Sequence, residues 1–274
     1  MRSEIGSFGV WRMVSGANAE LARQVEALGF GAIWLGGSPG GDLEVAERLL
    51  DATERIVIAT GIVNMWRDGA DVTAESYHRI AARHPGRFLL GVGIGHREAI
   101  EHYRRPLDKM VDYLDQLDQA AVPREDLVLA ALGPKALALA AERTRGAHPY
   151  LTTPRHTGYA RAVIGAGPLL APEHKVILDD DPVRARATGR PVVARYLDRV
   201  NYRNNLLREG WSEDDFTDGG SDRLVDALVL HGTVGEVAAG LTGHIEAGAD
   251  HVAIQVLGDD PIEAYRELSE ALLD

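Results

Sequence analysis

The 274-residue sequence contains no cysteine. This absence excludes a disulfide framework, an iron–sulfur site and a thiol nucleophile together, because each of them needs a cysteine sulfur. Long hydrophobic runs are missing as well. The first residues lack the roughly 7–15-residue apolar core of a secretory signal, and no apolar stretch approaches the roughly 18 residues of a membrane span. We therefore expect a cytoplasmic protein with no membrane partner.

Positive charge is scarce. The chain has 29 Lys and Arg against 41 Asp and Glu, which gives a formal net charge of −12. A field of that sign repels nucleic acid and anionic membranes, so neither is an expected partner. Any anionic cofactor must then bind in a locally positive pocket. The histidines show no metal-binding spacing, since His148 and His156 have no set of carboxylates around them, and we expect no metal site.

Short apolar, β-branched runs alternate with longer amphipathic stretches along most of the chain. Helical spacing is clearest where Leu107, Met110, Leu114 and Leu117 share one face. Alternation without hairpin signals indicates a parallel sheet covered by helices. We expect a single (β/α)8 TIM barrel over residues 1–274, and an open doubly wound sheet is the alternative. The runs that predict strands are 5–11, 31–35, 56–62, 88–94, 127–132, 148–151, 176–179 and 251–256.

Local signals refine this prediction. Gly29, Gly146 and Gly248 each follow a helical pattern and precede a strand pattern, which is typical of a left-handed helix end. The run Thr233–Glu236 has the pattern of a capping box. The polar stretch 184–222 is longer than one barrel helix requires. We interpret it as an extended helical segment after strand seven, with a mobile acidic part that can act as a lid; an ordinary surface excursion is the alternative.

Glycine marks several predicted strand ends, where a (β/α)8 barrel carries its active site. The clearest case is the run Ala131, Leu132, Gly133, Pro134 and Lys135. A strand ends, glycine turns, and proline takes the first helical position, where its missing N–H costs nothing. The lysine then adds positive charge to a helix N-terminus, which already favours anions. The run predicts a phosphate cradle, with a plain turn as the alternative.

His96 follows a second glycine-rich strand end. The run Gly91–Gly95 lacks the third glycine of the dinucleotide fingerprint and follows the fourth predicted strand, which argues against a nicotinamide site. A histidine at a strand end can hydrogen-bond a cofactor ring or transfer protons. We therefore take His96 as the candidate catalytic residue, and a structural or merely exposed histidine is the alternative.

Several runs together resemble a known family. Residues 59–66 (ATGIVNMW) and 85–96 (PGRFLLGVGIGH) resemble the luciferase-like monooxygenase superfamily. Residues 129–157 (LAALGPKALALAAERTRGAHPYLTTPRHT) resemble its deazaflavin-using branch, the probable F420-dependent oxidoreductases. The similarity covers nearly the whole chain in the order that the family has.

The resemblance implies a barrel of the bacterial luciferase type that seats a flavin or deazaflavin ring at the strand ends. A bulge behind the ring often holds a non-proline cis peptide in that family, which here would be Gly61–Ile62. Asn64 would face the cofactor's chain. The residues that would line the ring are Ile94, Gly95 and His96, and those that would hold the phosphate are Ala131, Leu132 and Gly133, followed by Pro134 and Lys135.

The chain also departs from the family pattern. Many deazaflavin-using relatives carry an acidic residue and a histidine after strand two, where this chain has Gly36-Gly37-Ser38-Pro39. A general base of the family type is therefore missing from that loop.

The expected function is hydride transfer between coenzyme F420 and a small organic substrate, with the cofactor supplying the chemistry. An FMN-dependent monooxygenase is the first alternative, and oxygen consumption separates the two because a deazaflavin has carbon at the fifth ring position. The second is a non-catalytic flavin- or deazaflavin-binding protein, which the Gly36-Gly37 loop makes reasonable. The sequence does not determine the oligomeric state, and a homodimer is retained as one option.

Replacing His96 tests its assignment. If it donates or accepts a proton, His96→Ala should lower kcat by about 10²–10⁴-fold. If it only positions the cofactor, binding should weaken while kcat is largely kept. Measuring kcat and cofactor affinity on the same variant separates these outcomes, and two unchanged values would remove His96 from the site.

Overall fold

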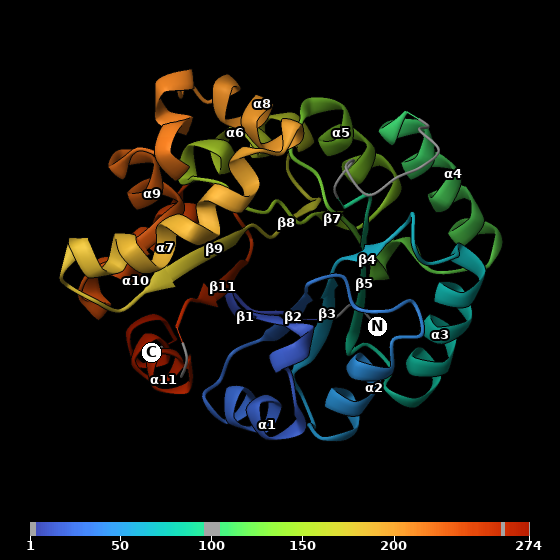
Figure 1. The fold of residues 1–274 in the computed structure, drawn as a ribbon. Helices are drawn as coiled ribbons and strands as arrows, with labels where there is room; N and C mark the ends of the chain where they lie inside the picture. Colours follow the sequence, from blue (N-terminus) through green and yellow to red (C-terminus); the bar gives the residue numbers. More distant parts are fainter. Residues whose placement is uncertain (1–3, 96–104, 259–260, 274) are drawn as a thin grey trace.

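The computed structural model describes residues 4–95, 105–258 and 261–273. Within them, eleven strands form one curved sheet in which all paired strands are parallel. Figure 1 shows helices around the outside of this sheet. The strands are β1 (Phe8–Met13), β2 (Ala32–Gly36), β3 (Val57–Gly61), β4 (Val63–Asn64), β5 (Phe88–Gly93), β6 (Leu127–Leu129), β7 (Gly146–Ala147), β8 (Leu169–Leu170), β9 (Glu173–Ile177), β10 (Val229–His231) and β11 (Val252–Val256).

The helices follow the strands in regular alternation. They are α1 (Ala19–Ala27), α2 (Glu44–Asp51), α3 (Ala70–Arg83), α4 (Pro106–Gln119), α5 (Pro134–Arg143), α6 (Pro154–Ile164), α7 (Pro182–Leu197), α8 (Val200–Arg208), α9 (Asp222–Leu228), α10 (Val234–Glu246) and α11 (Pro261–Leu272). Short 3-10 turns cover Val14–Gly16, Arg124–Asp126 and Glu213–Gly219. None of the helices described is both long and apolar enough to cross a membrane.

The sheet closes into a barrel through β8 and β9, which only Ala171 and Pro172 separate. β8 pairs with β7, whereas β9 pairs with β11, and β11 pairs with β1. Counting β3–β4 and β8–β9 each as one interrupted strand leaves eight positions around the ring, with β10 added beside β9. The predicted TIM-barrel fold is confirmed, and the open-sheet alternative is wrong.

Alternate residues of each strand face two different cores. Val10, Ile33 and Leu35 belong to the large cluster between the sheet and its helices. Trp11, Trp34 and their neighbours form a second cluster, together with Ala59, Leu89 and Val128. This period of two is what pleated strands impose. The inner cluster includes two indole rings, so large side chains fill the barrel as expected for this fold.

Several local predictions hold. Gly29 and Gly248 have φ values of 90° and 103°, the left-handed conformation expected after a helix. Thr233 and Glu236 form both bonds of a capping box at the start of α10. The peptide between Gly61 and Ile62 is cis, as the resemblance implied, and it interrupts the strand between β3 and β4.

Other predictions are wrong, because the apolar pattern of the sequence does not show the contacts that decide these positions. The run 148–151 is not a strand, since β7 ends at Ala147. Gly146 is not a helix end either: it lies in β7, where a side-chain carbon would come within 1.9 Å of the Leu169 carbonyl oxygen. The strand predicted at 176–179 begins earlier, because β9 buries Glu173 and Lys175, which an apolar pattern does not reveal. The short strands β8 and β10 were not predicted.

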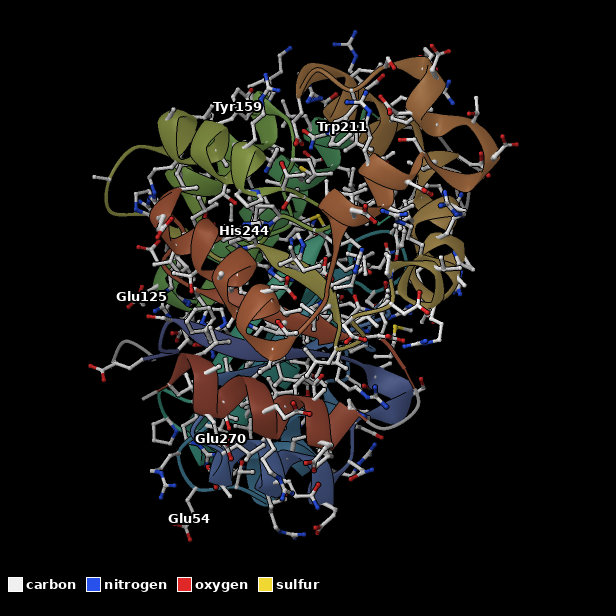
Figure 2. The ribbon with its side chains drawn as sticks, turned by 90° about the vertical axis from the view of Figure 1, so that its left-hand side faces the viewer. Glu54, Glu125, Tyr159, Trp211, His244 and Glu270 are labelled. Atoms are coloured by element: carbon white, nitrogen blue, oxygen red, sulfur yellow. The ribbon has the colours of Figure 1, made fainter. Side chains whose placement is uncertain are left out.

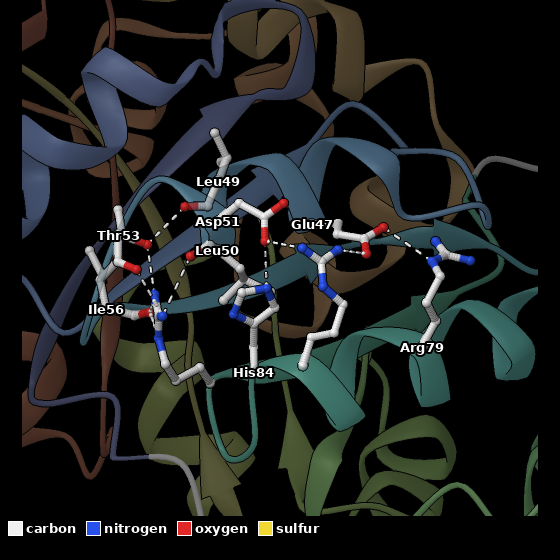
Figure 3. Close-up of polar contacts among 10 residues, drawn as sticks. Glu47, Leu49, Leu50, Asp51, Thr53, Ile56, Arg79 and His84 are labelled. Atoms are coloured by element: carbon white, nitrogen blue, oxygen red, sulfur yellow. Dashed lines mark hydrogen bonds and ion pairs between the residues drawn. The ribbon is translucent and has the colours of Figure 1, made fainter.

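Charged side chains connect the outer helices (Figure 3). Glu47 of α2 accepts from Arg79 of α3 at 3.1 Å and also pairs with Arg83. Arg87, just after α3, donates to the Thr53 carbonyl at 2.9 Å and to the Thr53 hydroxyl at 2.6 Å. These contacts fix the order of helices outside the strands that carry the cavity, and exposed pairs of this kind add little stability singly.

The predicted extended segment is helical and packs on the rim of the barrel. α7, α8, the 3-10 turn and α9 share a small core with Leu151 and Ile177. Glu209 anchors α8: Thr153 donates to its carboxyl group at 2.7 Å, and Asn205 at 2.9 Å. Burial raises the pKa of Glu209 to about 7. Figure 2 shows Trp211 of this segment at the end of the molecule opposite Glu54 and Glu270.

The barrel depends on close backbone contact at Gly91, which gives a test of the fold. An added methyl carbon there would lie 1.8 Å from the Thr60 carbonyl oxygen of β3. Gly91→Ala should therefore lower the free energy of unfolding by at least about 1–3 kcal/mol in a urea titration. Gly235→Ala is the control, because nothing lies within 4 Å of the added carbon on α10. Equal stabilities of the two variants would contradict the close approach.

Candidate active site

A cavity of about 760 Å³ opens at the carboxyl ends of the strands. Its size falls in the usual range for small-molecule and cofactor sites. Ten residues that the sequence assigned to a cofactor site all line this cavity: Gly61, Ile62, Asn64, Ile94, Gly95, Ala131, Leu132, Gly133, Pro134 and Lys135. The structure thus brings three separate predicted loops together, and their role in binding stays a prediction. The remaining candidate, His96, lies outside the described residues.

The loops after β3 and β5 meet at one side of the cavity. Asn64 uses its side-chain oxygen to accept from the Trp66 N–H at 2.9 Å, which fixes the amide. Gly95 has a φ of 57°, and a side-chain carbon there would lie 2.6 Å from the Asn64 amide nitrogen. A glycine is therefore needed where this loop turns past Asn64.

The loop after β6 has the geometry of an anion site. Gly133 is the N-cap of α5 and Pro134 lies in its first turn, so the start of the helix, where backbone N–H groups have no partner within the helix, lines the cavity. His156 donates to the Leu132 carbonyl at 3.0 Å and fixes the loop. The guanidinium of Arg208 lies 3.5 Å from the position of a side-chain carbon at Gly133. A phosphate at this helix start would meet both the helix dipole and a cation.

Charge in the cavity is opposite to that of the protein. Lys135, Arg199 and Arg208 line it, and among the described lining residues there is no Asp or Glu. The whole chain carries a formal net charge of −12. The condition set by the sequence, a locally positive pocket in an acidic protein, is met here. Arg199 and Arg208 were missed because the long segment that carries them could not be placed on the rim from sequence.

His148 is a third residue that sequence reasoning missed. Its ring stacks on Trp34 with centroids 4.2 Å apart, and Nδ1 donates to the Ala171 carbonyl at 2.6 Å. Burial lowers its pKa to about 4, so the imidazole is neutral near pH 7. Its Nε2 has no hydrogen-bond partner among the described residues and lies 3.0 Å from the position of a side-chain carbon at Gly61. The sequence pattern hid this position, because His148 was the first residue of a predicted strand, whereas β7 ends at Ala147.

The structure explains the glycines after β2. A side-chain carbon at Gly36 would lie 1.7 Å from the Trp11 indole, and one at Gly37 would lie 2.6 Å from the Met13 terminal methyl. Side chains from β1 therefore occupy the space beside this loop. The base missing from loop two is not replaced by a nearby carboxylate among the described lining residues. No group of three or more His, Asp or Glu in the described parts of the chain could hold a metal ion.

Comparisons with known proteins agree with this architecture. A sequence model of the luciferase-like monooxygenase family matches residues 8–251, so the chain belongs to this family. It is 27% identical over 255 residues to a 5,10-methylenetetrahydromethanopterin reductase from Archaeoglobus fulgidus, a match that covers 80% of this chain and 75% of the relative.

Solved structures show the same fold. An F420-dependent secondary alcohol dehydrogenase, in complex with an F420-acetone adduct, superposes with a TM-score of 0.77 at 14% identity, over 98% of this chain and 99% of that one. The oxygenating constituent of 3,6-diketocamphane monooxygenase from Pseudomonas putida, in complex with FMN, gives 0.67 at 14% identity, over 96% of both chains. The relatives are enzymes, and this chain has the fold of a luciferase-like oxidoreductase.

The loop after β6 yields a direct test. An aspartate at position 133 would place its carboxylate beside Arg208 and neutralise the cation that faces the loop. One charge-assisted contact is worth about 1.5–3 kcal/mol, so Gly133→Asp should weaken binding of a phosphate-bearing cofactor at least about tenfold. Gly133→Ala should change affinity little, because its added carbon makes only ordinary contacts. If folded Gly133→Asp bound the phosphate-bearing cofactor with unchanged affinity, the loop after β6 would not be a phosphate site.

Proposed function

We propose that this protein is an oxidoreductase that transfers hydride between coenzyme F420 and a small organic substrate. The observation that carries the proposal is the cavity at the strand ends, whose described lining includes the start of α5 and three cations but no carboxylate. Such a lining favours an anionic, phosphate-bearing cofactor over a neutral ligand. The reductase and dehydrogenase relatives support this choice, since the dehydrogenase is F420-dependent by name.

Different residues would bind different parts of the cofactor. The start of α5 with Gly133, Lys135 and Arg208 would hold the phosphate. Asn64 would face the cofactor's chain. The segments after β3 and β5, near Gly61 and Gly95, would seat the ring, which would supply the carbon that gives or accepts hydride. The protein contributes position and a site partly closed to water rather than an acid or base from loop two.

An FMN-dependent monooxygenase is the second candidate. One observation favours it: a structure of the same fold binds FMN and is described as a monooxygenase. The cationic loop after β6 suits the phosphate of either cofactor. Reaction with oxygen separates the two functions, because the deazaflavin ring has carbon where FMN has nitrogen at the fifth position.

Titration of the purified protein with F420, FMN and NADPH tests the proposal. We expect F420 to bind most tightly, and Arg208→Gln to weaken it about tenfold through loss of one charge-assisted contact. Ligand fluorescence and protein fluorescence quenching measure both. Tighter binding of FMN, with oxygen consumption by the reduced complex, would favour the monooxygenase. Binding of NADPH alone, or of none of the three, would contradict both candidates.

A further inference from the structure

One part of the cavity lining is aromatic. It is formed by Trp11 of β1, Tyr150 after β7, and Tyr196 and Tyr202 of the extended segment, which we call the aromatic wall. Ring centroids are 5.4 Å apart for Trp11 and Tyr150, 5.3 Å for Tyr150 and Tyr196, and 5.1 Å for Tyr196 and Tyr202. The wall adjoins the predicted cofactor loops, since the Trp11 indole nitrogen lies 3.2 Å from the position of a side-chain carbon at Gly61.

A chain of hydroxyl groups runs through this wall. The hydroxyl oxygens of Tyr150 and Tyr196 are 3.0 Å apart, and the Tyr150 hydroxyl donates to the side-chain oxygen of Gln255 at 3.2 Å. Either tyrosine can be the donor of the shared bond. If the Gln255 amide turns over, its nitrogen donates to Tyr150, Tyr150 donates to Tyr196, and the Tyr196 proton is directed elsewhere. The chain can thus present Tyr196 as an acceptor or as a donor.

A buried cation lies behind these hydroxyls. The Lys175 ammonium is 3.9 Å from the centroid of the Tyr150 ring and pairs with Glu173 at 2.9 Å, and both charged groups are fully buried. A buried ion pair is weak evidence for stability, so its position on the ring face is the more informative feature. A cation over the face of a tyrosine ring is attracted by the ring electrons, so Lys175 helps to hold the Tyr150 ring in place. Burial raises the pKa of Tyr150 and of Tyr196, which keeps both hydroxyls protonated.

We propose that the aromatic wall binds the apolar body of a neutral alcohol or carbonyl substrate and that the Tyr196 hydroxyl binds its oxygen. An alcohol needs an acceptor for its O–H, whereas the matching carbonyl compound needs a donor. The reversible hydroxyl chain supplies both without a change of charge. This inference rests on the proposed hydride transfer, for which such a pair is the oxidised and reduced form of one substrate. It does not assign the proton transfer to Tyr196.

The test uses cyclohexanol, cyclohexanone and cyclohexanecarboxylate as probes on the full-length protein. Ligand-observed NMR measures affinity without cofactor, and cyclohexanone is repeated with the oxidised cofactor, a combination that cannot react. We expect the neutral probes to bind more tightly than the carboxylate. Tyr196→Phe should weaken the neutral probes about three- to tenfold, the effect of one net hydrogen bond. The infrared carbonyl band of bound cyclohexanone should move to higher frequency in that variant.

Tyr159→Phe is the matched control, because Tyr159 is exposed on α6, lies outside the cavity lining and points away from the barrel in Figure 2. Tyr150→Phe, which breaks the link to Gln255, should also weaken the neutral probes. Unchanged affinity and carbonyl frequency in folded Tyr196→Phe would overturn the inference, as would preferred binding of the carboxylate, which would point to Arg199 instead. If the wild type bound neither F420 nor FMN, the proposed function would fail, while the cofactor-free measurements would still decide the role of Tyr196.

Discussion

Closure of the sheet through residues 169–177 is the constraint on which the rest of the structure depends. β8 pairs with β7 and β9 with β11, so one short stretch joins the two ends of the sheet. Because all strands are parallel, closure places their carboxyl ends on one rim. The loops after β3, β5 and β6, distant in sequence, then share a single cavity. Glycines at the tightest contacts, such as Gly91 against Thr60 and Gly146 against Leu169, allow the strands to come close enough for the ring to close.

The cavity lining has the opposite charge to the protein as a whole. A chain with a net charge of −12 repels anions at long range, and an anionic cofactor needs a local reversal of that field. Lys135 at the start of α5 and Arg208 of α8 provide it from two separate segments. Their convergence depends on how the extended segment packs against the barrel, which Glu209 helps to fix through Thr153. The cationic lining of the cavity therefore depends on the packing of α8.

The packing of β1 explains the two glycines at the end of β2. Trp11 and Met13 of β1 occupy the space beside Gly36 and Gly37, so most polar groups of the cavity lining come from other elements. His148, neutral and stacked on Trp34, and the tyrosines of the aromatic wall are among these groups. A chemistry that needs hydrogen bonds to a neutral oxygen fits this wall better than one that needs a carboxylate base.

The sequence by itself determined the fold class and named ten residues that the structure brings together around one cavity. Strand–helix alternation predicts a parallel barrel, and a run such as Gly133-Pro134 marks a strand-to-helix turn through local chemistry alone. The sequence could not reveal buried strands that lack the usual run of apolar residues. β7 consists of two small residues, and β9 buries a Glu–Lys pair, so neither carries the apolar signature of a strand. Arg208 and Tyr196 belong to the site only because closure of the ring brings the extended segment onto its rim. This contact joins helices and loops that are distant in the sequence, so residue spacing along the chain cannot predict it.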